Sequence, residues 1–387
     1  MNLIYSNNMS AKGGSARGGK KVLLVTRPIC PPWDEASKNF AYYLVRNIPD
    51  LEFYILTNKF LPDLPGNIHQ KPIYTSGRLT WLQRPRLLKL MKVRKDFDII
   101  HFMLTPNKLN AFGFKTFIKS KKVKTIQTIA TLREDLFSDN DYKAILFADV
   151  IITYSDYAKN KLNRLGFANV KRVYPGIDTE LYFPAMKHLA LLNQLKLEQN
   201  DFIITYPGEF TRLGAIDDII NMALQYSGIL TEKKIKIILA CRVKNKQDFE
   251  KREKIRDLLK KKNLTGQVIL PDTFETMEKV YNSSDVVIFP VRDMKGKFDV
   301  PLAVIEAMAC AKPVIISDLP ILAEFASSNN ACIIKPGDPE LLWTEIIKLY
   351  ESQSLRDQIG AQARKFVEEN FDIRKIAEIY SKIYEIL

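Results

Sequence analysis

The chain has 387 residues, of which 46% are hydrophobic and 26% are charged, as is typical of a globular protein and not of a disordered one. This length exceeds one ordinary hydrophobic core and favours two domains. The net charge of +14 lies in the first half, since residues 1–183 hold 29 Lys and Arg against 15 Asp and Glu, whereas residues 184–387 hold 29 of each. A basic domain beside a neutral one indicates an anionic surface or acceptor for the first domain.

Three further properties narrow the class of protein. The sequence has no run of the roughly 18 uncharged apolar residues that a membrane-spanning helix requires. Residues 1–20 are rich in Ser, Gly and Lys and lack the apolar stretch of a secretory signal, so we expect a flexible tail. The cysteines lie at scattered positions without metal-ligand spacing, which favours reduced, buried thiols in a cytoplasmic protein; they are Cys30, Cys241, Cys310 and Cys332.

The first half alternates apolar runs with helical patterns. Continuous apolar runs are typical of buried parallel strands. Strands are predicted at 21–26, 52–57, 98–103, 123–128 and 150–153. Helices are predicted at 36–47 and 156–165. This alternation predicts a doubly wound sheet.

The second half repeats the pattern after a connector at about 183–200. Strands are predicted at 202–206, 236–240, 267–270, 286–290, 313–317 and 331–334. Helices are predicted at 217–225, 246–262, 273–281 and 340–351, followed by an amphipathic last helix at 373–387. The sequence therefore predicts two Rossmann-like domains with a cleft between them, in which ligands bind at the carboxyl ends of the strands.

The most informative stretch is residues 299–318, DVPLAVIEAMACAKPVIISD. It predicts a loop, a short apolar helix and a buried strand, with Asp299 as helix N-cap and Pro301 in the first turn. Free backbone N–H groups at such a helix start suit an anionic ligand. Glu306 is an ionisable group on an otherwise apolar helix, which is costly unless something binds it. We expect it to hold ligand hydroxyls; the alternative is a structural carboxylate paired within the protein.

Four segments in a fixed order resemble glycosyltransferase family 4, the retaining sugar-nucleotide transferases of GT-B fold. EAMACAKPVI at 306–315 is similar to the family's donor-site helix, and VYPGIDTELYFP at 173–184 to its interdomain segment. DVVIFP at 285–290 resembles the strand before the donor loop, and KPGDPE at 335–340 the start of a late helix.

The resemblance implies a fold, an activity and several roles. The fold is GT-B, two doubly wound domains with the last helix crossing back to the first. The activity is transfer of a sugar from a nucleoside diphosphate sugar with retention, without a metal or a cofactor. Glu306 would bind the ribose, with Val300 and Leu302 also on the donor side. The family's first acid falls at Phe298, so Asp299, one residue later, is assigned to the catalytic side near the donor sugar.

The segment 208–214, GEFTRLG, follows the first strand of the second domain. A Gly-rich turn there can approach a phosphate closely, so Gly208 is assigned to the donor. The family's phosphate-binding Arg is replaced by Glu209, and its Lys is missing. Arg212 is therefore the cation expected on the diphosphate. The alternative is an ordinary surface arginine.

The first domain offers fewer specific signals. After the first strand, RPICPPWDEASK at 27–38 lacks the family's double glycine and offers Asp34, Ser37 and Lys38 as acceptor contacts. His101 resembles a family histidine and is a catalytic candidate, although a satisfied core histidine is the alternative. Ala130 stands where the family often has a histidine, and Arg133 nearby is a substitute on the acceptor side.

The segment from Arg78 to Lys95 mixes seven Lys and Arg with Leu, Trp and Met. One interpretation is an interfacial helix on an anionic membrane surface, and the other is an ordinary basic surface helix. No RNP, KH or helix-turn-helix pattern supports nucleic-acid binding.

The sequence thus predicts a cytoplasmic glycosyltransferase, peripheral on the inner membrane face if that segment binds lipid. The acceptor would be a glycan, a lipid-linked molecule or a small molecule. The predicted parts are a tail at 1–20, an acceptor-side domain at 21–183, a nucleotide-sugar domain at 184–370 and a returning helix at 371–387. Open alternatives are a degenerate GT-B protein that binds without turnover, a sugar-nucleotide epimerase, and a membrane or nucleic-acid binder.

Overall fold

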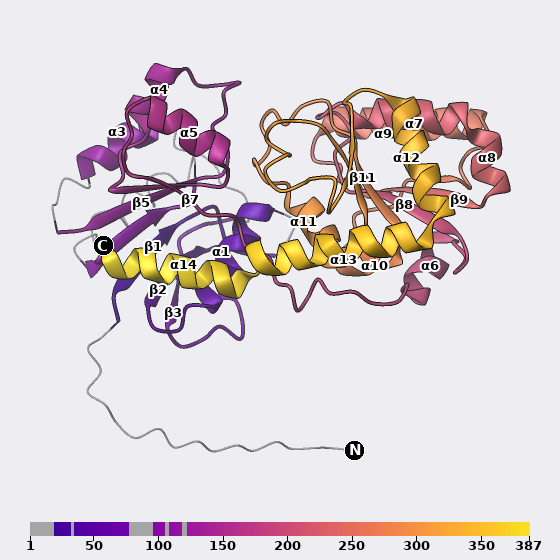
Figure 1. The fold of residues 1–387 in the computed structure, drawn as a ribbon. Helices are drawn as coiled ribbons and strands as arrows, with labels where there is room; N and C mark the ends of the chain where they lie inside the picture. The colour runs from indigo at the N-terminus through magenta and orange to yellow at the C-terminus, as the bar shows by residue number, and fades with distance from the viewer. Residues whose placement is uncertain (1–18, 32–34, 77–95, 105–107, 118–121) are drawn as a thin grey trace, which may run out of the picture.

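The structure, a computed structural model, describes residues 19–31, 35–76, 96–104, 108–117 and 122–387. It contains two α/β domains that lie next to each other (Figure 1). Asp34 and the basic segment 78–95 fall outside the described residues, so both predictions about them stay untested.

The first domain is built on a seven-stranded parallel sheet of order β3-β2-β1-β4-β5-β6-β7. Its strands are β1 (Lys21–Val25), β2 (Glu52–Thr57), β3 (Ile68–Pro72), β4 (Ile99–Phe102), β5 (Lys124–Ile129), β6 (Val150–Thr153) and β7 (Val170–Arg172). Its helices are α1 (Ala36–Arg46), α3 (Lys108–Phe117), α4 (Asp139–Ile145) and α5 (Asp156–Arg164).

The second domain has a six-stranded parallel sheet of order β10-β9-β8-β11-β12-β13. Its strands are β8 (Phe202–Tyr206), β9 (Ile235–Leu239), β10 (Val268–Ile269), β11 (Val286–Phe289), β12 (Val314–Ser317) and β13 (Cys332–Ile334). Its helices are α6 (Leu189–Leu195), α7 (Ala215–Gln225), α8 (Ser227–Glu232), α9 (Lys246–Lys261), α10 (Met277–Ser283), α11 (Leu302–Ala309), α12 (Pro339–Glu351) and α13 (Gln353–Asn370).

Both sheets have the doubly wound strand order, in which the first strand lies beside the fourth. This confirms the predicted fold class of two Rossmann-like domains. The order reverses between β1 and β4 in one sheet and between β8 and β11 in the other. Ligands of such sheets bind where the order reverses, outside the carboxyl ends of the strands. The loops after β8 and β11 are therefore the first place to search for a site.

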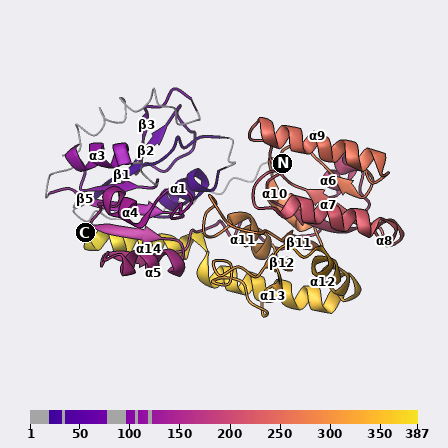
Figure 2. The same cartoon turned by 90° about the horizontal axis from the view of Figure 1, so that it is seen from above.

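The last helix, α14 (Ile373–Ile386), returns to the first domain as predicted. In both views α13 lies on the second domain and α14 continues onto the first (Figures 1 and 2). Its inward face buries Ile376, Tyr380 and Tyr384. Phe40 of α1 packs against Tyr380, with ring centroids 5.9 Å apart.

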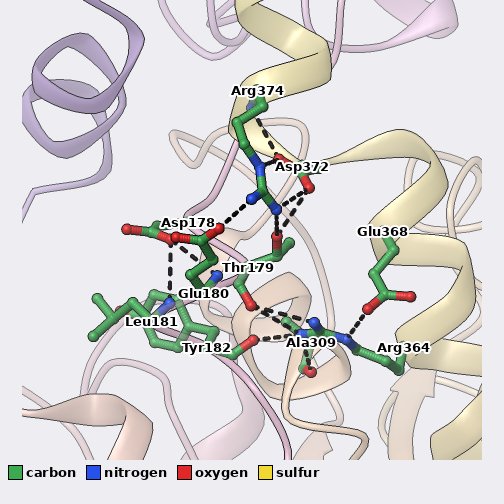
Figure 3. A network of polar contacts seen from close by, with 10 residues as sticks. All are labelled: Asp178, Thr179, Glu180, Leu181, Tyr182, Ala309, Arg364, Glu368, Asp372 and Arg374. Carbon is green, nitrogen blue, oxygen red and sulfur yellow. Dashed lines mark hydrogen bonds and ion pairs between the residues drawn. The ribbon is translucent and has the colours of Figure 1, made fainter. Parts of the chain in front are cut away.

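A polar network fixes the point where the chain crosses between the domains (Figure 3). Arg374 binds Asp372 at 2.7 Å and also pairs with Glu180 of the interdomain segment 173–184, which together with residues 183–200 is called the connector from here on. Thr179 donates to Asp372 over 3.0 Å. Arg364 of α13 donates to the carbonyl of Thr179 at 3.3 Å and to that of Ala309 at 2.8 Å. One guanidinium thus ties the connector to the carboxyl end of α11, where helical carbonyls lack partners.

Two local predictions about the start of α11 are wrong. The N-cap of α11 is Pro301, and no side chain caps the helix there. Pro301 therefore precedes the first turn, and Asp299 lies two residues outside the cap. The side chain of Asp299 is held by the first domain instead.

None of the described helices is long and apolar enough to cross a membrane.

Candidate functional site

The loops after β8 and β11 form one unit at the reversal of strand order. The N–H of Arg292 donates to the carbonyl of Leu213 over 2.7 Å, and the Arg292 guanidinium binds Asp218 of α7 at 2.6 Å. These bonds hold the end of β11 against the beginning of α7. The predicted phosphate turn and the predicted donor loop are therefore direct neighbours.

Glycine is required at position 208 because the ring of Tyr206, at the end of β8, lies against its Cα. A Cβ there would lie 1.9 Å from Cζ of Tyr206, whose ring folds under the turn. The turn closes at Leu213 and Gly214, with φ of 73° and 72°. Gly214 is then the N-cap of α7, which begins at Ala215. The segment is thus a tight strand-to-helix turn, as predicted.

Glu209 organises three cations at this turn. Its buried carboxylate pairs with Arg212 at 2.6 Å, with Lys297 at 2.5 Å and also with Lys244. Burial would raise the pKa of Glu209, but the hydrogen bond from Arg212 and the charges of the two lysines hold it well below its usual range. The four side chains together carry a net charge of +2.

The lysines come from outside the turn. Lys244 follows β9 and Lys297 lies in the loop after β11. Burial lowers the pKa of Lys297, and neighbouring Lys244 adds to that effect, while Glu209 opposes it. An anion beside these cations would relieve their mutual repulsion. We name this group of Glu209, Arg212, Lys244 and Lys297 the Glu209 cluster.

Arg133 of the first domain lies next to the Glu209 cluster. The Gly296 carbonyl accepts from Arg212 over 3.3 Å. A Cβ on Gly296 would lie 3.3 Å from Nη1 of Arg212 and 3.7 Å from Nε of Arg133. Arg133 itself binds Asp135 at 2.8 Å. Arg133, predicted on the acceptor side, and Arg212, predicted on the diphosphate, thus both lie next to Gly296.

Glu306 lies on α11 and remains partly exposed. The hydroxyl of Tyr281 donates to its carboxylate over 3.2 Å, and Tyr182 of the connector forms a second side-chain hydrogen bond. Burial raises the pKa of Glu306 to about 8, against the effect of both tyrosines. The internal pairing expected as the alternative is therefore present. A carboxylate has about four acceptor positions, so two tyrosines leave room for ligand hydroxyls.

Asp299 connects the two domains. Its carboxylate accepts from Ser155, the N-cap of α5, and from Thr131. Its N–H donates to the carbonyl of Ala130 over 3.0 Å. Burial raises the pKa of Asp299 to about 7, although both hydroxyls oppose the shift. Val300 and Leu302 beside it are buried, with 1% and 7% exposed.

His101 has the environment of a core histidine. It is 0% exposed, and its ring nitrogens lie 2.7 Å from the hydroxyls of Tyr384 and Thr128. Burial lowers its pKa to about 3, so the ring is neutral at ordinary pH. Both nitrogens are thus used within the fold, which does not support the catalytic role expected from the sequence.

The remaining acceptor-side residues lie on α1. Ser37 is partly buried and Lys38 is buried, both in the first turn after the loop that follows β1. They follow β1 in the chain, as predicted. In the described part of the chain, no group of three or more His, Cys, Asp or Glu could hold a metal ion.

The second domain matches a known family. Residues 190–366 match the family model described as "Glycosyl transferases group 1". An uncharacterized glycosyltransferase of Methanocaldococcus jannaschii is 25% identical over 65% of this chain and 62% of its own length. The N-acetyl-alpha-D-glucosaminyl L-malate synthase of Bacillus anthracis is 23% identical over 75% of each chain. The match thus spans less than two thirds of the first of these relatives.

The fold has counterparts among solved structures. HepE of Anabaena, solved in complex with UDP and glucose, has a TM-score of 0.75 and 15% identity over 95% of this chain and 100% of its own. The GT-B fold is therefore shown across nearly the whole chain. The chain is thus similar to glycosyltransferases in its second domain and shares the GT-B fold.

Proposed function

We propose that this protein transfers a hexosyl group from a nucleoside diphosphate sugar to an acceptor held by the basic first domain. We further propose that it does so with retention, without a metal, and as a member of glycosyltransferase family 4. The observation that carries the proposal is the Glu209 cluster, which places three cations at a tight glycine turn where doubly wound sheets bind ligands.

The chemistry requires stabilisation of a leaving group. As the bond between the sugar and the diphosphate breaks, negative charge grows on the diphosphate oxygens. Arg212, Lys244 and Lys297 are fixed in advance by one carboxylate, so they need little reorganisation when that charge appears. Glu209 thus acts as a positioning residue, and the three cations would contact the diphosphate.

Glu306 and Asp299 would lie on either side of the nucleoside and sugar. Glu306 keeps acceptor capacity for ribose hydroxyls, and we expect Glu306→Gln to weaken nucleotide binding by about 1–3 kcal/mol. Asp299 lies at the contact between the domains, where a bound sugar would meet both. Arg133, beside Gly296, would contact the donor or the acceptor from the first domain.

The acceptor is proposed from charge. The first half of the chain carries the whole net charge of +14, which suits an anionic acceptor. The name of the Bacillus anthracis relative denotes transfer to L-malate, a small anion. A glycan or a lipid-linked acceptor with phosphate or carboxylate groups would suit the same surface.

The test is turnover and binding with a panel of UDP-, GDP- and ADP-sugars, with and without EDTA. We expect one donor to give transfer or slow hydrolysis that EDTA leaves unchanged. Lys244→Gln combined with Lys297→Gln should weaken binding of the corresponding diphosphate at least tenfold. The matched control is Lys260→Gln with Lys261→Gln at the exposed end of α9. Equal affinity in both double variants would remove the diphosphate role.

A second candidate is a GT-B protein that binds a nucleotide sugar without turnover. It is favoured by Phe298, which stands at the family's first acid and packs against Tyr154 of the first domain, with centroids 5.9 Å apart. Asp299, the nearest acid, is already engaged by Ser155 and Thr131. Saturable binding of a nucleotide sugar, with no transfer, hydrolysis or isomerised sugar, would support this second candidate.

A further inference from the structure

The first domain carries a groove whose lining residues all lie outside the loops after β8 and β11. Its volume is about 390 Å³. It lies over β7, the last strand of the seven-stranded sheet, between α5 and α14. Its lining comprises Lys159, Val170, Lys171, Arg172, Val173, Ile379, Lys382, Ile383 and Ile386. We name it the β7 groove.

The charged groups of the β7 groove have one sign. Of the described residues that line it, four are Lys or Arg and none is acidic. Arg172 pairs with Asp156 at 3.4 Å and lies over the ring of Tyr174. The charge of Arg172 is therefore partly neutralised within the protein. Lys171 and Lys382 are exposed, on β7 and α14 respectively. The surplus cations come from three separate elements and converge on one groove.

The floor and open end of the groove are apolar. Ile379, Ile383 and Ile386 follow one another at helical spacing on α14. Ile383 is 4% exposed, but Ile379 is 42% and Ile386 is 77% exposed. The domain core is already covered by the neighbouring face of α14, which buries Ile376, Tyr380 and Tyr384. Ile383 therefore packs into the core, whereas Ile379 and Ile386 beside it leave an apolar edge that the described part of the chain does not fully cover.

We propose that the β7 groove binds an anionic phospholipid. The headgroup phosphate would lie among Lys159, Lys171 and Lys382, and an acyl chain would cover the exposed isoleucines. Charge complementarity selects an anion, and the apolar edge selects an amphiphile. A purely polar anion, such as a nucleic acid, would satisfy the lysines and leave Ile379 and Ile386 in water. This proposal does not depend on the proposed transferase activity.

The test is binding of the full chain to vesicles of phosphatidylglycerol and phosphatidylcholine against vesicles of phosphatidylcholine alone, at 0.15 M salt. Lysines near an anionic membrane each contribute about 1 kcal/mol, or roughly fivefold in affinity. Lys159→Gln, Lys171→Gln and Lys382→Gln together should therefore weaken binding at least tenfold. The control removes three exposed lysines of the second domain, by Lys260→Gln, Lys261→Gln and Lys262→Gln.

A second variant separates a lipid groove from general attraction of charge. Ile379→Ser with Ile386→Ser keeps every charge and should also weaken binding at least fivefold. Soluble short-chain phosphatidylglycerol should bind the wild type saturably and bind both groove variants less well. Thermal unfolding and nucleotide binding report that each variant is folded. The proposal would be overturned if the wild type showed no preference for anionic vesicles, or if the control and groove triple variants lost vesicle binding equally. It would also be overturned if the isoleucine changes left vesicle binding unaffected, or if vesicle binding fell only when cations in residues 78–95 were replaced.

Discussion

At the scale of single residues, Glu209 shows how one carboxylate can hold several cations in place. Three cationic groups packed together repel one another, and burial adds to the cost of charging Lys297. The Glu209 carboxylate offsets both the repulsion between the cations and the cost of burying Lys297, because each cation contacts the carboxylate. Loss of the carboxylate would leave Lys297 partly buried without this partner, while Arg212 and Lys244 are exposed to water.

Glu209→Gln should therefore lower the free energy of unfolding by about 1–2 kcal/mol, less than the loss of a fully buried ion pair, because Arg212 and Lys244 are exposed and water can solvate them. Urea denaturation measures this loss, with Glu351→Gln on the exposed end of α12 as a control. Pyrophosphate should stabilise the variant more than the wild type, because it supplies the missing negative charge. An unchanged midpoint, with no gain from pyrophosphate, would contradict the organising role.

Glu306 makes the stability of the ligand-free protein depend on pH. Its folded pKa of about 8 lies above the usual glutamate value of 4.5, so between these values the folded state binds the proton more tightly than the unfolded state does. This stabilisation is present in full below about pH 4.5 and is lost as pH rises toward 8. The raised pKa of Asp299, about 7, adds a stabilisation that is likewise lost as pH rises toward 7.

Glu306→Gln should flatten the fall in stability between pH 5 and pH 8, because the amide resembles the protonated acid and does not ionise. Thermal or urea unfolding at several pH values tests this, with Asp299 left intact as the remaining source of slope. Parallel curves for the two proteins would mean that Glu306 is ionised in the folded state across the whole range.

The residues that sequence reasoning found and missed differ in how they reach the site. Gly208, Arg212 and Glu306 lie in short motifs, so their types and spacing were informative. Lys244 and Lys297 are single lysines in separate loops, and only the pairing of β8 with β9 and β11 brings them to Glu209. The sequence indicates at Glu209 only the loss of a phosphate ligand, whereas in the structure the Glu209 carboxylate pairs with three cations.

At the scale of elements, α11 is positioned from its carboxyl end. Arg364 donates to the Ala309 carbonyl, and α13 packs so closely that a Cβ on Gly360 would lie 2.1 Å from the carbonyl oxygen of Ala311. Glu306 is one turn from that end of α11. A shift of α13 would therefore move the carboxylate relative to Tyr182 and Tyr281.

Gly360→Ala should destabilise the protein by about 1–3 kcal/mol, since the new methyl group overlaps backbone and forces the helices apart. Gly228→Ala is the matched control. It lies on α8, where a Cβ would meet no atom of the described chain within 4 Å, so the same change should stabilise by up to about 1 kcal/mol. Calorimetric unfolding of both variants measures the contrast; equal effects would mean that the close approach is not needed.

Strands with continuous apolar runs were predicted from the sequence, whereas the two missed strands lie at the edges of the first sheet. Central strands such as β8 are buried on both faces and appear as apolar runs. The edge strands β3 and β7 have the sequences IHQKP and VKR, which carry no such signal. They pair only because a neighbouring strand offers its free edge, a tertiary effect that local pattern does not contain. The polar helix α13 was missed for a similar reason, since only its few buried positions face the core.

At the scale of the whole molecule, polar bonds between the described residues join the two domains at two places. The connector and α14 form the crossing shown in Figure 3. A separate set lies between α5 and the second domain, where Ser155 donates to Asp299 and Glu324 accepts from the N–H groups of Asp156 and Tyr157 at 2.7 and 2.8 Å. The resemblance to GT-B proteins predicted the crossing helix. It did not predict Glu324, because no local pattern marks a carboxylate that caps a helix in another domain.

Glu324→Gln should loosen this contact between the domains. The carboxylate of Glu324 accepts from two N–H groups at the positive end of α5, and an amide has one oxygen to offer. We expect a loss of about 1 kcal/mol, which corresponds to roughly fivefold faster hydrogen exchange at Asp156 and Tyr157. The radius of gyration in solution should rise, because the crossing at α14 remains and the contact at α5 opens. Glu351→Gln serves as the matched control on a surface outside the contact. Unchanged exchange at both amides would show that Glu324 does not hold the domains together, and that the crossing alone fixes their arrangement.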